Sequence, residues 1–237
     1  MNIEFKNAGK PVETLFSENA AYIEAITNDV KTRAGEAGQF LNWIGVLPRT
    51  QLANIDNIYD LVEKAKNGGK FSEIAILGIG GSRHTTEAIA KMLNLDSKMH
   101  FYSAIDAESF KRFINKIDLE KTLFMVVSKS GGTLETTTAY ENVKLVLENR
   151  FGKEEARKHF VAMTDKDASK SKLRTIVEAG DILLSGLVHD DVGGRFSIFD
   201  DATLFALAFC GMTKEQMKEL LEGSLKAQEA CLSDDIN

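Results

Sequence analysis

Five short apolar runs, separated by segments of helical periodicity, place the strongest constraint on how this chain of 237 residues folds. They are apolar rather than alternating, as expected of parallel strands covered by helices on both faces. Strands that alternate with helices predict an α/β fold with a doubly wound, five-stranded parallel sheet. The expected strands are residues 73–77, 100–103, 122–127, 160–164 and 182–186.

Helical patterns also flank the expected sheet at both ends. The sequence predicts a helical segment over residues 1–68, a sheet domain over 69–200, and C-terminal helices over 201–237 that lead toward an absent second domain. Residues 199–210 are strongly apolar and expected to be buried, and residues 213–216 fit a capping box. The other expected helices are 20–32, 54–67, 84–93, 107–117, 134–149, 153–158 and 169–178.

The bulk composition is that of an ordinary soluble globular protein, with 43% apolar and 27% charged residues. The formal net charge of −6 argues against nucleic acid as a partner. No apolar run reaches the roughly 20 residues of a membrane span, and no signal pattern opens the chain, so we expect no membrane partner and a cytoplasmic location. Cys210 and Cys231 have no metal-ligand spacing and are expected to be ordinary thiols.

The first apolar run leads into a glycine-rich loop, Gly-Ile-Gly-Gly-Ser, at residues 78–82. Small residues before a helix N-terminus let backbone N–H groups approach an anion. One alternative is a dinucleotide fingerprint with Asp106 as its ribose-binding acid, but Arg83 stands where the last glycine belongs. Another is a turn needed only for strand-to-helix geometry. His84 is either an acid–base group or part of the first helical turn.

The third apolar run leads into a hydroxyl-rich loop, Ser-Lys-Ser-Gly-Gly-Thr, at residues 128–133. Ser128, Ser130 and Thr133 place three hydroxyls within six positions, and both hydroxyls and amides bind phosphate oxygens. A plain Ser/Gly turn with Thr133 as a helix N-cap is the alternative. Lys129 is expected to contribute its backbone amide. Both loops follow strands of one parallel sheet and meet at its carboxyl edge, which favours a bound phosphate compound.

A third group of residues is Val-Gly-Gly-Arg-Phe-Ser, at residues 192–197. The paired glycines let the backbone come close, and Arg195 offers a permanent charge and forked donors to a phosphate or a developing enediolate. A surface loop with solvated charges is the alternative. The preceding His189, Asp190 and Asp191 are a weak metal candidate, because consecutive side chains point in different directions.

Taken in this order, the three motifs resemble those of the glucose-6-phosphate isomerase family, and residues 40–48 resemble the connector before its first sheet. The likeness runs from residue 40 to residue 235. It implies a flavodoxin-like sugar-isomerase (SIS) domain. It also implies interconversion of glucose 6-phosphate and fructose 6-phosphate through a cis-enediol. That reaction needs a base and an electrophilic stabiliser but no metal or organic cofactor.

The resemblance also implies roles for individual residues. Arg195 would be the catalytic residue that stabilises the enediolate, beside Gly194. The sugar phosphate would be bound by Gly81, Ser82, Ser128, Lys129, Ser130 and Thr133. In the family the glutamate base, a ring-opening histidine and a late lysine follow well after the Gly-Gly-Arg motif. Glu135 is not at the position of the base, and its place suits a helix N-terminal acid.

We therefore expect these residues to resemble the N-terminal half of an isomerase that is a homodimer at full length, and to be inactive on their own. Residues 83–86 replace a more apolar stretch of the family, and Gly132 and Leu134 stand where threonines are common. A different phosphosugar therefore stays open. Two other functions remain as alternatives, a stand-alone SIS domain that senses phosphosugars and a nicotinamide-binding domain.

Overall fold

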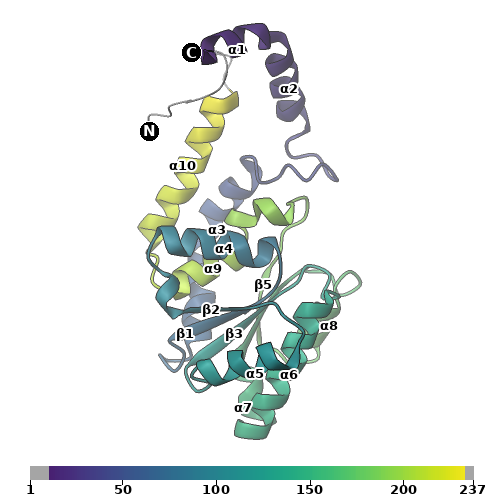
Figure 1. The fold of residues 1–237 in the computed structure, drawn as a ribbon, viewed down its shortest axis with the longest axis vertical. Coiled ribbons are helices and arrows are strands. Elements are labelled where there is room, and N and C mark those ends of the chain that lie inside the picture. The colour runs from purple at the N-terminus through teal and green to yellow at the C-terminus, as the bar shows by residue number, and fades with distance from the viewer. Residues whose placement is uncertain (1–10, 233–237) are drawn as a thin grey trace.

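A parallel sheet lies at the centre of the computed structural model, which describes residues 11–232 (Figure 1). Within these residues the sheet has five strands in the order β2-β1-β3-β4-β5, and every neighbouring pair is parallel. This confirms the predicted doubly wound α/β fold. The strands are β1 (Glu73–Leu77), β2 (Met99–Tyr102), β3 (Thr122–Val127), β4 (Phe160–Thr164) and β5 (Leu184–Leu187).

Four strands match their predicted bounds to within one residue, whereas β5 begins two residues later than predicted. Its pairing with β4 starts where Leu184 meets Val161. Ile182 is fully buried in the hydrophobic cluster around α6 although it lies outside the strand. An apolar residue that packs without pairing therefore explains the difference.

Strand side chains alternate between two hydrophobic clusters, one on each face of the sheet. Ile74 and Ile76 belong to the first cluster, and Ala75 and Leu77 to the second. Helices on the first face are α3 (Val46–Lys66), α4 (Gly81–Met92), α9 (Asp201–Phe209) and α10 (Lys214–Leu232). Those on the second are α5 (Ala107–Lys116), α6 (Leu134–Phe151), α7 (Lys153–Ala156) and α8 (Lys172–Glu178).

The helix expected from residue 54 begins earlier, because α3 starts at Val46, inside the predicted connector. Gly45 precedes it with a φ of 75°, and Pro48 lies in its first turn, where a proline costs no helical hydrogen bond. In the segment predicted to be helical, α1 (Val12–Glu18) is not among the individual helices expected, while α2 (Ala20–Arg33) matches its prediction closely. Three short 3-10 helices are η1 (Asp96–Lys98), η2 (Arg157–His159) and η3 (Gly194–Phe199).

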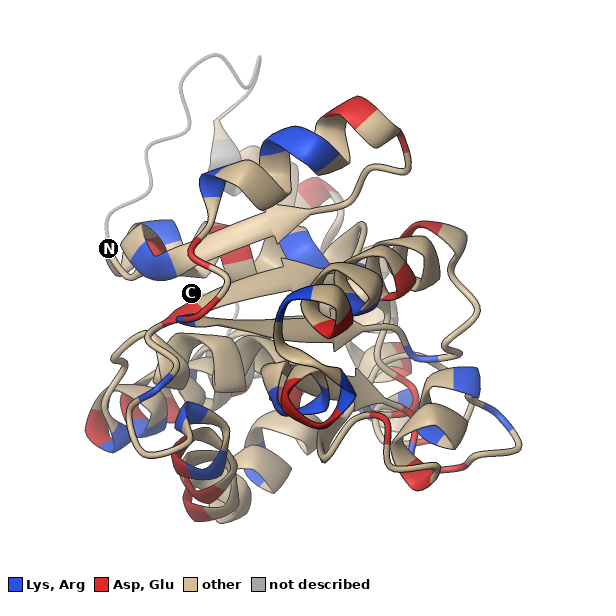
Figure 2. Cartoon of the chain, turned by 90° about the horizontal axis from the view of Figure 1, so that it is seen from below, with Lys and Arg blue, Asp and Glu red and all other residues tan. Residues whose placement is uncertain are grey.

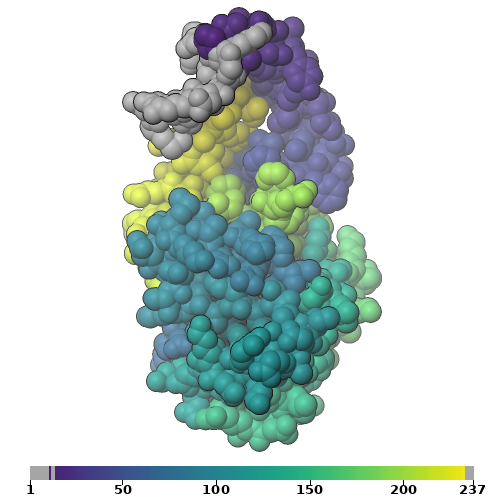
Figure 3. Space-filling view, in the orientation of Figure 1, coloured from purple at the N-terminus to yellow at the C-terminus, as the bar shows by residue number. Residues whose placement is uncertain are grey.

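The C-terminal helices follow the sequence prediction. Every residue of α9 is buried. The capping box before α10 is formed: the Gln216 amide N–H donates to the Thr213 hydroxyl at 3.2 Å, and the Thr213 N–H donates to the Gln216 side chain at 2.9 Å. In Figure 3 the far end of α10 and the helices α1 and α2 extend beyond the broad body that contains the sheet.

Charged residues of both signs are intermixed over the helices and loops (Figure 2). Among the described residues, no helix combines the length and apolarity that crossing a membrane requires.

Candidate functional site

The two glycine-containing loops lie next to each other, because they follow neighbouring strands. β1 and β3 pair in parallel up to Leu77 and Val126, immediately before the loops begin. The helices that follow, α4 and α6, cover opposite faces of the sheet. The chain therefore diverges between β1 and β3, and at such a point an open α/β sheet offers a crevice for a ligand.

The first loop turns sharply and then packs against the Gly-Gly-Arg segment. Gly80 has a φ of 57°, which favours glycine, and α4 begins at Gly81. A Cβ added at Gly81 would lie 1.7 Å from the carbonyl oxygen of Gly194. Ser82 is partly exposed in the first turn of α4. The fold thus brings together two segments more than a hundred residues apart.

The second loop keeps its hydroxyls free of helix capping. Thr133 occupies the N-cap position of α6, but its side chain makes no capping hydrogen bond and lies 3.2 Å from the Ser128 hydroxyl. Ser130 is exposed, and its hydroxyl accepts from the Gly132 N–H at 3.3 Å. The amides at the start of α6 thus remain available to an anion, as a phosphate site requires.

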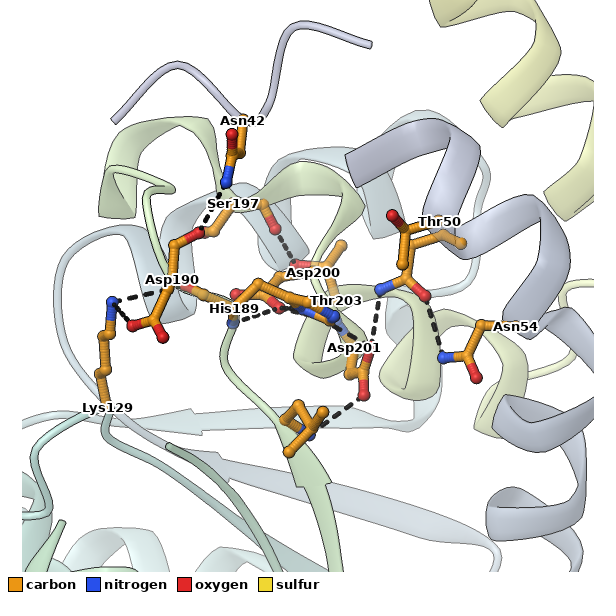
Figure 4. A network of polar contacts seen from close by, with 12 residues as sticks. Asn42, Thr50, Asn54, Lys129, His189, Asp190, Ser197, Asp200, Asp201 and Thr203 are labelled. Carbon is orange, nitrogen blue, oxygen red and sulfur yellow. Dashed lines mark hydrogen bonds and ion pairs between the residues drawn. The ribbon is translucent and has the colours of Figure 1, made fainter. Parts of the chain in front are cut away.

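Lys129 directs its side chain away from the loop, as Figure 4 shows. Its ammonium group lies 2.9 Å from a carboxylate oxygen of Asp190 and 3.5 Å from the backbone oxygen of His189. This hydrogen bond from Lys129 is the main reason that the pKa of Asp190 is lowered. The side chain of Lys129 is therefore engaged, which leaves its backbone amide for a ligand.

The third segment presents Arg195 at the surface. Arg195 is exposed in η3, and its guanidinium makes no hydrogen bond or ion pair with any residue that the structure describes. The next residue, Phe196, stacks on Trp43 with ring centroids 4.5 Å apart. Ser197 donates to the Gly194 oxygen at 2.8 Å. The backbone around Arg195 is anchored while its charged group is free to meet a ligand.

Sequence reasoning missed a buried polar network below this segment (Figure 4). The His189 ring lies 2.7 Å from a carboxylate oxygen of Asp200, which also accepts from the backbone N–H groups of His189 and Asp201. Asp201 accepts from the Gln51 amide at 2.6 Å and from the Leu187 N–H at 3.0 Å. The pair of aspartates before an apolar run signals a helix start, but nothing in the sequence indicates their distant partners.

The network is built from protein donors rather than around an ion. Atoms of His189, Asp200 and Asp201 lie within 4.8 Å of one another. However, the facing oxygens already accept hydrogen bonds from Gln51 and from backbone amides. The three consecutive residues that the sequence offered as a metal candidate contact different partners. His189 faces Asp200, Asp190 faces Lys129, and Asp191 accepts from the Gly38 N–H at 2.7 Å.

The residues that depart from the family pattern are held by neighbouring segments. Arg83 donates to Ser103 at 2.9 Å and pairs with Glu87 at 3.2 Å. Thr85 lies 3.4 Å from the Ser197 hydroxyl, and Thr86 lies 3.0 Å from that of Thr203. These hydroxyls tie α4 to the Arg195 segment and to α9, so their polarity is satisfied without a ligand.

The remaining candidates have structural environments. Asp106 accepts from the Ser109 N–H at 2.8 Å and so caps α5, and Glu135 lies in the first turn of α6. His84 is exposed. Cys210 and Cys231 are free thiols, and burial raises the pKa of Cys210 to about 12. A thiol with so high a pKa carries no thiolate at neutral pH and is unreactive.

One pocket among the described residues lies over the ends of β4 and β5, beside the loops rather than between them. It has a volume of about 270 Å³. Its lining residues are Asn42, Val46, Leu47, Thr50, Asp165, Lys166, Leu187, Val188, His189 and Asp190. A cavity of about 30 Å³ below the second loop is too small for a sugar phosphate.

Comparison with known proteins places this arrangement in context. The chain is 28% identical over 226 residues to glucose-6-phosphate isomerase of Acholeplasma laidlawii, covering 92% of this chain and 51% of that protein. It is 33% identical over 181 residues to the enzyme of Borreliella afzelii, covering 73% and 33%. The chain thus spans about half or less of the length of these relatives.

Two solved structures resemble this chain over most of its length. A hypothetical protein of Thermus thermophilus matches with a TM-score of 0.81 at 27% identity, over 93% of this chain and 51% of that one. A glucose-6-phosphate isomerase of Chlamydia trachomatis matches with a TM-score of 0.66 at 28% identity, over 76% and 34%. The family model described as phosphoglucose isomerase matches residues 50–234. With the motifs, the fold and these matches in agreement, the chain belongs to the phosphoglucose isomerase family.

Proposed function

We propose that this chain binds the phosphate of a hexose 6-phosphate between its two loops and serves the interconversion of glucose 6-phosphate and fructose 6-phosphate. The observation that carries the proposal is the convergence of three segments at one edge of the sheet. The loops after β1 and β3 are neighbours through Leu77 and Val126, and Gly81 touches Gly194 beside Arg195. In this proposal, the phosphate donors of the loops and the Arg195 guanidinium face the same ligand.

Each part of the site has a distinct task in this proposal. Backbone amides at the starts of α4 and α6, with Ser82, Ser128, Ser130 and Thr133, hold the phosphate. Arg195, beside Gly194, stabilises the negative charge that develops on the cis-enediol when a base moves a proton between C2 and C1 of the open-chain sugar. We propose that the base comes from residues outside these 237. We also propose that the full-length protein is a homodimer.

Calorimetric titration tests the phosphate site. Glucose 6-phosphate is expected to bind, and glucose without its phosphate is not. Ser130→Ala removes one hydrogen bond to a charged group and is expected to weaken binding by about 1–2 kcal/mol. Ser169→Ala is the matched control, because that hydroxyl lies in the loop after β4 and bonds to Asp167 of its own turn at 2.7 Å. Equal affinities of the two variants would remove the assigned role of Ser130.

A second candidate function is a phosphosugar-sensing module that binds without turnover. It would use the same loops after β1 and β3 and would need no catalytic base. An isomerisation assay of the purified chain, together with the coding sequence beyond codon 237, separates the two. Both functions predict protection from heat by a hexose 6-phosphate. Protection by a nicotinamide cofactor instead would favour the dinucleotide alternative, in which Asp106 would have to leave its place as the cap of α5.

A further inference from the structure

The segment that carries Arg195 is closed at its base by a hydrogen-bonded pair, His189 and Asp200. His189 begins the segment, two residues after the end of β5 at Leu187, and Asp200 ends it, directly before α9. The ring and the backbone N–H of His189 both bond to the same Asp200 oxygen, at 2.7 and 3.2 Å. Closing a loop at its ends restricts all the backbone between them, and this loop contains Gly194 and Arg195.

The base of the loop is itself fixed to the core. Asp200 is 2% exposed and is the N-cap of α9, whose residues are all buried. The neighbouring Asp201 joins α3 through Gln51 and β5 through Leu187. The pair of His189 and Asp200 therefore fixes the loop relative to three core elements, α9, α3 and β5. A buried polar pair with satisfied hydrogen bonds is well suited to such positional specificity.

We propose that His189, paired with Asp200, is a positioning residue that holds Arg195 in place for the enediolate. This inference rests on the proposed function above and extends it to a residue outside the two phosphate loops. The two phosphate loops contact this segment at Gly81 and Lys129, but their own anchors are β1, β3 and the helices that follow these strands. Breaking the pair is therefore expected to disturb Arg195 while leaving phosphate binding in place.

The charges around His189 favour a protonated ring. Burial by itself lowers the pKa of His189, but the hydrogen bond and charge of Asp200, with Asp201 and Asp190, outweigh it and raise that pKa. Burial also raises the pKa of Asp200. The other groups that face His189 are Lys129 from the second loop, Asp165 and Lys166 across the pocket, and the uncharged Asn42, Thr50 and Gln51.

Two probes separate positioning of Arg195 from phosphate binding. Inorganic phosphate occupies the loops alone. A five-carbon aldonic acid 5-phosphate adds a carboxylate where the enediolate would form, so it also needs Arg195. His189→Ala is expected to weaken the sugar-acid phosphate about tenfold, as for a hydrogen bond to a charged group, and to change phosphate affinity less than about twofold.

Three further variants make the test specific. His189→Gln keeps a donor for Asp200 without a titrating charge, so it is expected to recover affinity at neutral pH. In the wild type, affinity for the sugar-acid phosphate is expected to fall as the pH rises through the pKa of His189, and His189→Gln removes this dependence. In an Arg195→Ala background, His189→Ala is expected to add no further loss. His100→Gln is the matched control, because His100 pairs with Glu73 at 2.8 Å at the amino ends of β2 and β1.

The outcomes distinguish the two proposals. If the wild type binds neither probe, the proposed function fails and the inference fails with it. If the wild type binds both, the inference alone is overturned by any of three results. These are an unchanged affinity of His189→Ala for the sugar-acid phosphate, an equal loss for both probes, and a further loss in the Arg195→Ala background. The last two would show a general structural role.

Discussion

The α-carbon of Gly81 lies directly against the backbone carbonyl of Gly194, so that a Cβ at Gly81 would stand 1.7 Å from the carbonyl oxygen. The obstacle is backbone and cannot rotate away as a side chain would. The contact joins the first residue of α4 to the first residue of η3. Position 81, where the phosphate loop meets the arginine segment, therefore favours glycine, which has no Cβ.

Gly81→Ala is expected to lower the free energy of unfolding by about 2 kcal/mol through this clash, and to weaken binding of glucose 6-phosphate as the two segments separate. Gly194→Ala is the matched control, because its added Cβ would meet nothing within 4 Å. We expect its free energy of unfolding to change by less than about 0.5 kcal/mol. Urea denaturation and calorimetric titration measure both quantities, and equal stabilities of the two variants would contradict the contact.

Thr133→Val is expected to weaken glucose 6-phosphate binding by about 1–2 kcal/mol, since it removes a hydroxyl that faces Ser128 and the site. Its stability should change little, because Thr133 makes no capping bond in α6. Asp106→Ala is expected to lower the free energy of unfolding, because it removes the side-chain cap of α5, and to leave binding of glucose 6-phosphate unchanged. A loss of stability in Thr133→Val with unchanged binding would support the plain N-cap alternative.

Gln51→Leu is expected to cost about 2 kcal/mol in the free energy of unfolding. Gln51 is 0% exposed and donates to Asp201 at 2.6 Å, so leucine leaves a buried carboxylate oxygen without one of its donors. Asn57→Ala, an exposed position of the same helix, should change stability by less than about 0.5 kcal/mol. Urea denaturation of the two variants at neutral pH is the measurement.

Glu155 supplies a pH-dependent contribution to stability. Hydrogen bonds from Lys70 and Lys158 lower the pKa of Glu155 to about 2. A depressed folded-state pKa contributes stability that is present above the unfolded pKa and is lost as the pH falls through about 2. Because the carboxylate is partly exposed, we expect a contribution of about 1 kcal/mol or less.

Stability curves of the wild type and Glu155→Gln between pH 6 and pH 2 test this effect. The wild type should be more stable at pH 6, and the difference should shrink toward zero as pH 2 is approached. A difference that stays constant over this range would show that the pair with Lys70 does not depend on the charge of Glu155.

Much of the site could be predicted because each part is encoded locally. A glycine-rich loop after an apolar run, and a serine-rich loop after another, identify strand ends without any long-range information. A parallel sheet then follows from the α/β pattern, whereas the order that makes β1 and β3 neighbours is seen in the structure. Local signals are weaker for β5, where Ile182 is buried outside the strand, and for α3, whose start at Val46 lies in an apolar connector.

The partners of the polar side chains could not be predicted, because they come from residues distant in sequence. Lys129 meets Asp190, Gln51 meets Asp201, and His189 meets Asp200 across a loop. Hydroxyl and charge patterns show which residues can form hydrogen bonds or ion pairs, but not which partners the fold brings to them. The same limit applies to Thr133, which resembles an N-cap in sequence and faces Ser128 in the structure.

The sequence by itself determined the parallel sheet, the two phosphate-type loops and the glycines before Arg195, since hydrophobic periodicity and glycine content act over a few residues. The tertiary structure alone decided that Gly81 borders Gly194 and that His189 and Asp200 close the loop between them. The physical reason is that such contacts depend on how α3, α4 and α9 pack on one face of the sheet. Packing brings together backbone and buried charges that no local pattern relates.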